Sequence, residues 1–148
     1  MSSAVSNLAE LLHSMHPVLN RGVYAFVSLP GGSVPDRVEP IATFRENEGL
    51  TLIVEERQAS DAGLPILFRA AWITLTVHSD LQAVGLTAAV ATALAAAGIS
   101  CNVVAAAYHD HLFVPAESAS RAIAVLRTLQ VRADLNRGTS RSGTDAAV

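Results

Sequence analysis

The densest group of side chains that could do chemistry is the run His109-Asp110-His111. Imidazole and carboxylate groups are ligands for zinc or nickel, and two histidines at i and i+2 would share one face of a strand. Asp110 would then point to the opposite face, and a hairpin turn at His109-Asp110 would break the alternation. We therefore favour a hairpin corner with a hydrogen-bonded histidine, and we expect no metal and no cofactor.

Nucleophilic and phosphate-binding groups are equally poorly supported. Cys101 could act as a nucleophile beside a histidine, but it lies in an apolar stretch where a buried, unreactive thiol is usual. Gly31-Gly32-Ser33 could cradle a phosphate, yet no dinucleotide-binding or P-loop motif surrounds it. Every basic residue is arginine, which excludes chemistry that depends on lysine. These observations favour a protein without catalytic activity.

Composition excludes further classes of protein. The 148 residues are 51% hydrophobic and 16% charged, which is typical of a folded chain. The net charge of -3 provides no positive field for nucleic acid. The most apolar stretch, 86–99, is shorter than the roughly 20 residues that a membrane helix needs, and residues 1–15 lack the apolar run typical of a secretory leader. We expect a cytoplasmic protein that binds neither nucleic acid nor membrane, with a core built mainly from aliphatic residues because only 5% of the chain is aromatic.

Hydrophobic periodicity and turn residues predict alternating strands and helices along the chain. The boundaries suggest an N-terminal helix over 1–16, a first half over 17–66, a second half over 67–131 and a disordered tail over 132–148. The predicted elements, in chain order, are a helix over 5–15, a strand over 22–29, a loop over 30–39, strands over 41–45 and 50–55, a helical turn over 57–62, a strand over 67–78, a helix capped by Ser79 or Asp80 and ending near Ala97, strands over 99–108 and 111–114, and a helix from 115 to 129.

The two halves contain an internal repeat. Leu52-Ile53-Val54 followed by Ala59-Ser60-Asp61-Ala62 matches Leu112-Phe113-Val114 followed by Ala119-Ser120-Arg121-Ala122, and the offset is 60 residues in both cases. The first half has only a loop where the second half has its first helix. The sequence therefore predicts an α+β fold of tandem ferredoxin-like βαββα units, with an antiparallel sheet and helices packed on one face.

Three stretches of the second half resemble the ACT-domain family, in particular stand-alone proteins with two ACT-like units. They are Trp72-Ile73-Thr74-Leu75-Thr76-Val77-His78-Ser79 with the residues that follow to Thr87, Gly98-Ile99-Ser100-Cys101-Asn102-Val103-Val104, and Tyr108-His109-Asp110-His111-Leu112-Phe113-Val114-Pro115. The resemblance covers about 19–129 and implies binding of an amino acid or a related small metabolite. It places that site in the loop between the first strand and the first helix, which is 78–85 here.

The chemistry of this loop agrees with what the resemblance implies. A helix N-terminus suits a ligand carboxylate, Asp80 could accept the ligand ammonium, and Gly85 would let the ligand approach the backbone. Simple capping by Ser79 or Asp80 and close helix packing at Gly85 remain alternative interpretations. The candidate ligand-binding residues are Ser79, Asp80, Leu81, Val84, Gly85, Cys101, Asn102 and Val103.

Three functions follow in order of preference. The first is a regulatory module that binds a small molecule, forms a homodimer through exposed sheet edges and acts on a partner protein. The second is a structural or protein-interaction domain that binds no metabolite and carries an apolar patch. The third is a metal-dependent enzyme that uses His109 and His111.

Overall fold

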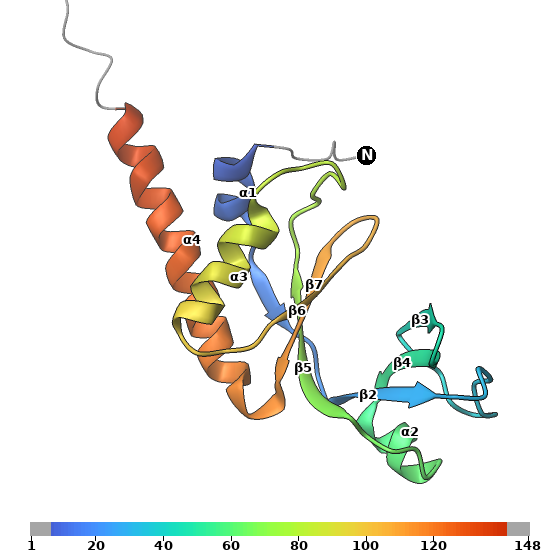
Figure 1. The fold of residues 1–148 in the computed structure, drawn as a ribbon. Coiled ribbons are helices and arrows are strands. Elements are labelled where there is room, and N and C mark those ends of the chain that lie inside the picture. Colours follow the sequence, from blue (N-terminus) through green and yellow to red (C-terminus); the bar gives the residue numbers. More distant parts are fainter. Residues whose placement is uncertain (1–6, 142–148) are drawn as a thin grey trace, which may run out of the picture.

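The computed structural model describes residues 7–141. These residues form one seven-stranded antiparallel sheet, and the helices cover one of its faces (Figure 1). The elements are α1 (Leu8–Ser14), β1 (Pro17–Leu19), β2 (Tyr24–Leu29), β3 (Ala42–Glu46), β4 (Gly49–Glu55), α2 (Glu56–Asp61), β5 (Phe68–Leu75), α3 (Leu86–Ala96), β6 (Asn102–Ala105), β7 (Asp110–Pro115), the short 3₁₀ helix η1 (Ala116–Ser118) and α4 (Ala119–Arg141).

The sheet combines two halves that share β5. The strand order is β3-β4-β2-β5-β7-β6, and β1 also pairs with β5. Along one edge of β5, β2 pairs with residues 68–70 and β1 with residues 73–75, while β7 occupies the other edge over 70–75. The first half is thus β3-β4-β2-β5, and the second half repeats the same order as β6-β7-β5-β1. This arrangement confirms the predicted tandem ferredoxin-like α+β fold.

The N-terminal segment belongs to the second half. The prediction treats residues 1–16 as a separate helix and includes 17–19 in the first half, whereas the structure places β1 as the last strand of the second half. Leu11 and Met15 of the α1 segment are fully buried in one core with Leu94 and Leu126 of α3 and α4. Pro17, read as a helix stop, also begins a strand.

The hydrophobic core between the sheet and the helices is aliphatic, as the composition predicts. Under α1, α3 and α4 it includes Ile73, Leu112 and Val90, and under α2 it includes Val54 and Ala59. Between β2 and β3 the chain forms no helix, so the first half has nothing in place of α3.

Two helix boundaries differ from the prediction. Neither Ser79 nor Asp80 caps α3, which begins only at Leu86. The tail predicted as disordered from residue 132 is helical through Arg141, and residues 142–148 lie outside the described part of the chain. Contacts with α1 explain the longer helix: Asp134 pairs with His13, and the Gln130 side-chain amide donates to the His13 carbonyl at 2.6 Å. Tertiary contacts therefore stabilise a helix whose sequence has little amphipathic pattern.

Within residues 7–141, none of the helices combines the length and the apolar character needed to cross a bilayer.

Candidate functional site

The loop between β5 and α3 holds most of the predicted site. Ser79 is buried, and its hydroxyl donates to Oδ2 of Asp110 at 3.1 Å. Asp80 is exposed, and its Oδ1 accepts from the backbone N–H of Gln82 at 2.9 Å. The Asp80 carboxylate, which was predicted to cap the helix, thus caps this local turn. A short polar side chain can hydrogen-bond to a nearby backbone N–H as readily as to one at a helix end.

Gly85 has a packing role. It is the residue before α3, with a φ of +105° that L side chains rarely adopt. A Cβ atom at this position would lie 3.1 Å from Cδ2 of Leu8. The alternative interpretation of close packing therefore describes this glycine, although its partner is α1 and not the sheet.

A small pocket lies beside this loop. Its volume is about 50 Å³, enough for a few water-sized groups and too small for a whole amino acid. Two carboxylates, Asp80 and Asp110, and the hydroxyls of Ser79 and Thr87 contribute to its wall. Leu81 lines it as well, whereas Val84 is largely exposed beside it.

The remaining predicted residues lie at the other end of β6. Ala105 borders the pocket and pairs with Asp110, whereas Asn102 pairs with Phe113 three residues further along β7. Cys101 and Val103 pack against the helix-side core, and Asn102 is exposed. Burial raises the pKa of the Cys101 thiol to about 11, so it stays protonated near neutrality and is a poor nucleophile. Within one copy of the chain, these three residues do not meet the β5–α3 loop.

Asp110 is the pocket residue that sequence reasoning missed. The predicted turn at His109-Asp110 excluded it from the following strand, but β7 begins at Asp110. Residues 110, 112 and 114 alternate onto the helix-side face, where Leu112 and Val114 are buried. Had the strand been started one residue earlier, its alternation would have placed a carboxylate under the helices.

The two histidines of the 109–111 run are engaged in separate hydrogen bonds. His109 Nδ1 lies 3.3 Å from the carbonyl of Val77, and His111 Nδ1 accepts from Trp72 Nε1 at 3.0 Å. In the described part of the chain, His, Cys, Asp and Glu side chains form no group of three or more that could hold a metal ion.

The surroundings of His111 predict that folding stability depends on pH. Burial lowers the pKa of His111, the neighbouring His109 lowers it further, and Asp110 opposes both. A lowered pKa in the folded state means that the unfolded state binds the proton more tightly. The contribution of His111 to stability is therefore complete above the unfolded pKa of about 6.5 and falls as the pH drops below it.

We expect the free energy of unfolding of the natural chain to decrease more between pH 7.5 and 5 than that of a His111→Asn variant. Asn retains an acceptor for Trp72 and does not titrate. Urea denaturation at the two pH values measures the difference, and equal pH dependence in the two proteins would contradict it.

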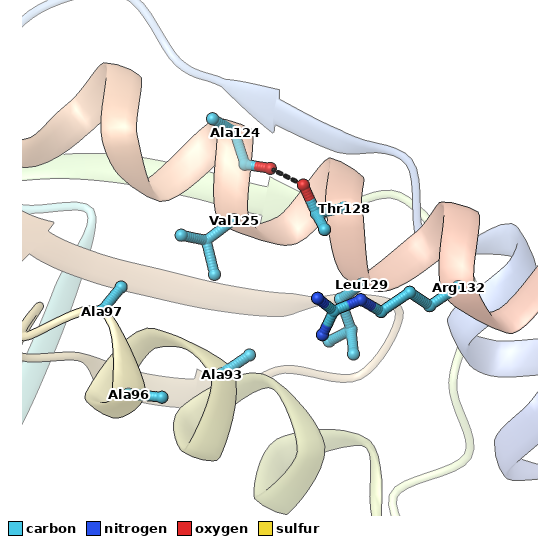
Figure 2. A pocket seen from close by; sticks show the side chains of 8 residues that line it. All are labelled: Ala93, Ala96, Ala97, Ala124, Val125, Thr128, Leu129 and Arg132. Atoms are coloured by element: carbon cyan, nitrogen blue, oxygen red, sulfur yellow. Dashed lines mark hydrogen bonds between the residues drawn. The ribbon is translucent and has the colours of Figure 1, made fainter.

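A larger surface hollow lies elsewhere, between α3 and α4. It has a volume of about 410 Å³ and is lined by small and aliphatic side chains, with Thr128 and Arg132 at one end (Figure 2). The Thr128 hydroxyl donates to the carbonyl of Ala124 at 3.0 Å and is thus already bonded. This groove offers an apolar surface and no convergent polar groups for a metabolite.

Comparison with known proteins agrees with the two-unit architecture. Residues 3–71 match one ACT-domain profile and residues 67–128 match a second one. The two matches meet within β5, the strand that the two halves share. Among curated proteins, none matches the sequence.

Three solved structures illustrate the relationship. A Vibrio cholerae protein of unknown function, described as a possible transport protein, is 51% identical over 83% of this chain and 95% of its own, with a TM-score of 0.75. An Agrobacterium tumefaciens protein is 15% identical over 77% of this chain and 87% of its own, with a TM-score of 0.57. The ligand-free regulatory subunit of aspartate kinase from Thermus thermophilus is 11% identical over 78% of this chain and 97% of its own, with a TM-score of 0.58. The last two share the fold.

Proposed function

The chain belongs to the ACT-domain family, and we propose that it is a regulatory module that binds the head group of an amino acid at the β5–α3 loop. The observation that carries this proposal is the small polar pocket at that loop, with the buried carboxylate of Asp110 in its wall. The fold shared with an aspartate kinase regulatory subunit supports a regulatory role. Such a module acts on a partner protein and catalyses no reaction itself.

The charges around the pocket suit a zwitterion. Asp110 and Asp80 can accept hydrogen bonds from a ligand ammonium, and such charge-assisted bonds are the stronger kind. The N-terminus of α3 lies at the same pocket through Leu86 and Thr87, and its dipole favours the ligand carboxylate. Ser79 holds Asp110 in place from the loop side.

A second copy of the chain would complete this site. Within residues 7–141, β6 is a terminal strand of the sheet, and its Ala105 borders the pocket. If two β6 strands pair antiparallel, the Asn102 end of one strand lies opposite the Ala105 end of the other. The predicted residues Cys101, Asn102 and Val103 would then approach the loop of the other copy. We propose a homodimer of this kind, because pairing also covers an exposed sheet edge.

Thermal unfolding against a panel of the standard amino acids tests the proposal. At a ligand concentration of 100 times Kd, binding should stabilise the fold by about 2.7 kcal/mol, a shift in Tm of several degrees for a domain of this size. We expect one chemical subset of amino acids to give this shift. Asp80→Ala should abolish it with little change in the stability of the ligand-free protein, because Asp80 is exposed.

Asp61→Ala is the matched control, because Asp61 is an exposed carboxylate on α2, away from the pocket. This variant should respond to the ligand like the natural chain. A full response in Asp80→Ala, or a flat panel with the natural chain, would refute the assigned site.

The groove between α3 and α4 favours a second candidate function, a protein-interaction domain that binds no metabolite. Its apolar lining is the kind of patch that this function requires. A flat amino-acid panel together with a partner protein that is displaced by Ala93→Arg would establish it.

A further inference from the structure

The face of the sheet opposite the helices carries most of the aromatic side chains. Strand alternation places six of the seven on this open face, and Tyr108 is the exception. Five of these rings contact one another in a continuous layer: Phe26 contacts Phe68 and Phe113 with centroid separations of 5.5 Å, Trp72 stacks on Phe113 at 6.3 Å, and Tyr24 meets Trp72 edge-on at 5.2 Å. The six are Tyr24, Phe26, Phe44, Phe68, Trp72 and Phe113.

A pocket of about 210 Å³ lies over this layer. Trp72, Phe113 and His111 form its aromatic wall. Residues from both ends of the strand order close its sides: Ile41 and Ala42 at the start of β3, and Val104 and Ala106 at β6. The sheet therefore curls so that its two outer strands approach each other across the open face.

The pocket has few polar groups, and hydrogen bonds fix their orientation. Trp72 Nε1 can only donate, so His111 Nδ1 must accept, and a neutral ring then carries its proton on Nε2. Thr74 and Asn20 support the ring from the β5 side, with Thr74 Oγ1 3.1 Å from His111 Nδ1 and Asn20 Nδ2 donating to Thr74 Oγ1 at 2.9 Å. No Asp, Glu or Arg lines the pocket.

We propose that this pocket binds an uncharged, planar aromatic molecule that carries one hydrogen-bond acceptor. The Trp72 and Phe113 rings, whose planes differ by 17°, provide the aromatic wall. The His111 ring, tilted by 53° to Trp72, provides one N–H donor beyond its bond to Trp72. The absence of charged side chains from the lining disfavours an ion, since nothing would offset its desolvation.

This site is separate from the pocket assigned to the amino acid. His111 and Phe113 alternate with Asp110 and Leu112 along β7, so the two pockets lie on opposite faces of the sheet. The aromatic site does not depend on the proposed function, and a failure of either proposal leaves the other intact.

Benzamide is a suitable probe, because it is uncharged, planar and carries a carbonyl acceptor. Titration of the natural chain, followed by the fluorescence of Trp72, the one tryptophan of the chain, reports directly on the pocket. We expect saturable binding that is about fivefold tighter than that of cyclohexanecarboxamide, which has the same acceptor and a ring that is not flat. Benzoate should bind about tenfold more weakly than benzamide.

Two substitutions of the same type separate the pocket from nonspecific binding. Val104→Phe fills the pocket from its partly exposed rim and should abolish benzamide binding. Val131→Phe makes the same change on exposed α4 and should leave binding unaltered. Ala106→Leu is a second way to fill the pocket if Val104→Phe does not fold.

Three results would overturn the proposal. They are equal binding of the flat and non-flat amides, benzamide binding that survives both filling variants, and benzamide binding that disappears as the protein concentration rises. The last result would mean that a second copy covers the open face.

Discussion

Leu11→Ala should lower the free energy of unfolding by about 3 kcal/mol, as is usual for a fully buried leucine. Leu11 is 0% exposed, and it shares its core with Leu94 and Leu126 of the second half. An N-terminal helix that merely followed the surface would tolerate this change. The expected loss therefore measures how far residues 8–19 are part of the second half. Urea denaturation followed by circular dichroism gives the number.

Leu135→Ala is the control for this experiment. Leu135 lies on α4 with 66% of its surface exposed, so the same substitution should change the unfolding free energy by less than about 0.5 kcal/mol. Equal, small losses in the two variants would show that α1 adds nothing to the core.

Gly49→Ala should be the most damaging glycine substitution in the described part of the chain, with an expected loss of about 3 kcal/mol. Gly49 begins β4 in the β3–β4 hairpin and has a φ of +152°. A Cβ atom there would lie 2.6 Å from the backbone oxygen of Leu29. Because the obstacle is backbone in a paired strand, relief requires β2 to move. A decrease in Tm measured by calorimetry checks the prediction.

Gly31→Ala serves as the matched substitution in the neighbouring loop. A Cβ atom at Gly31 would have no atom within 4 Å apart from those of Gly31 itself and its two chain neighbours. This variant should be neutral or slightly stabilised, because alanine restricts the unfolded chain more than glycine does. Similar losses for both glycines would mean that the Cβ contact with Leu29 does not set the cost at Gly49.

The periodicity of hydrophobic residues predicted those strands and helices that are long enough to show at least one full repeat of it. The repeat of Leu52-Ile53-Val54 and Leu112-Phe113-Val114 correctly identified β4 and β7 as equivalent strands of the two halves. β1 was missed because it is three residues long and its partner is β5, far away in sequence. No local signal reveals such a pairing. Likewise, the end of α4 depends on contacts with α1 that its own residues do not encode.

The candidate site was predicted in part, for physical reasons that differ from residue to residue. The loop residues Ser79 to Leu81 do line a pocket, since the first strand and first helix of the unit fix where that loop lies. Asp110 was missed because the predicted strand began one residue too late, so the alternation that buries Leu112 and Val114 was not extended to it. Asn102 was grouped with the loop although it lies at the far end of β6. The aromatic face was not predicted, because alternation separates two faces of a sheet without saying which one the helices cover.

The position of β1 has a consequence for biosynthesis. Residues 8–19 are made before α3 and α4, yet their burial depends on those helices and on β5. During synthesis on the ribosome, Leu11 and Met15 cannot be buried in this core until more than a hundred further residues have been added. Contacts of such long sequence separation slow folding, because the loop between the partners has to close first. All four strands of the first half lie within residues 24–75, so this half can form early and present β5, with which β1 later pairs.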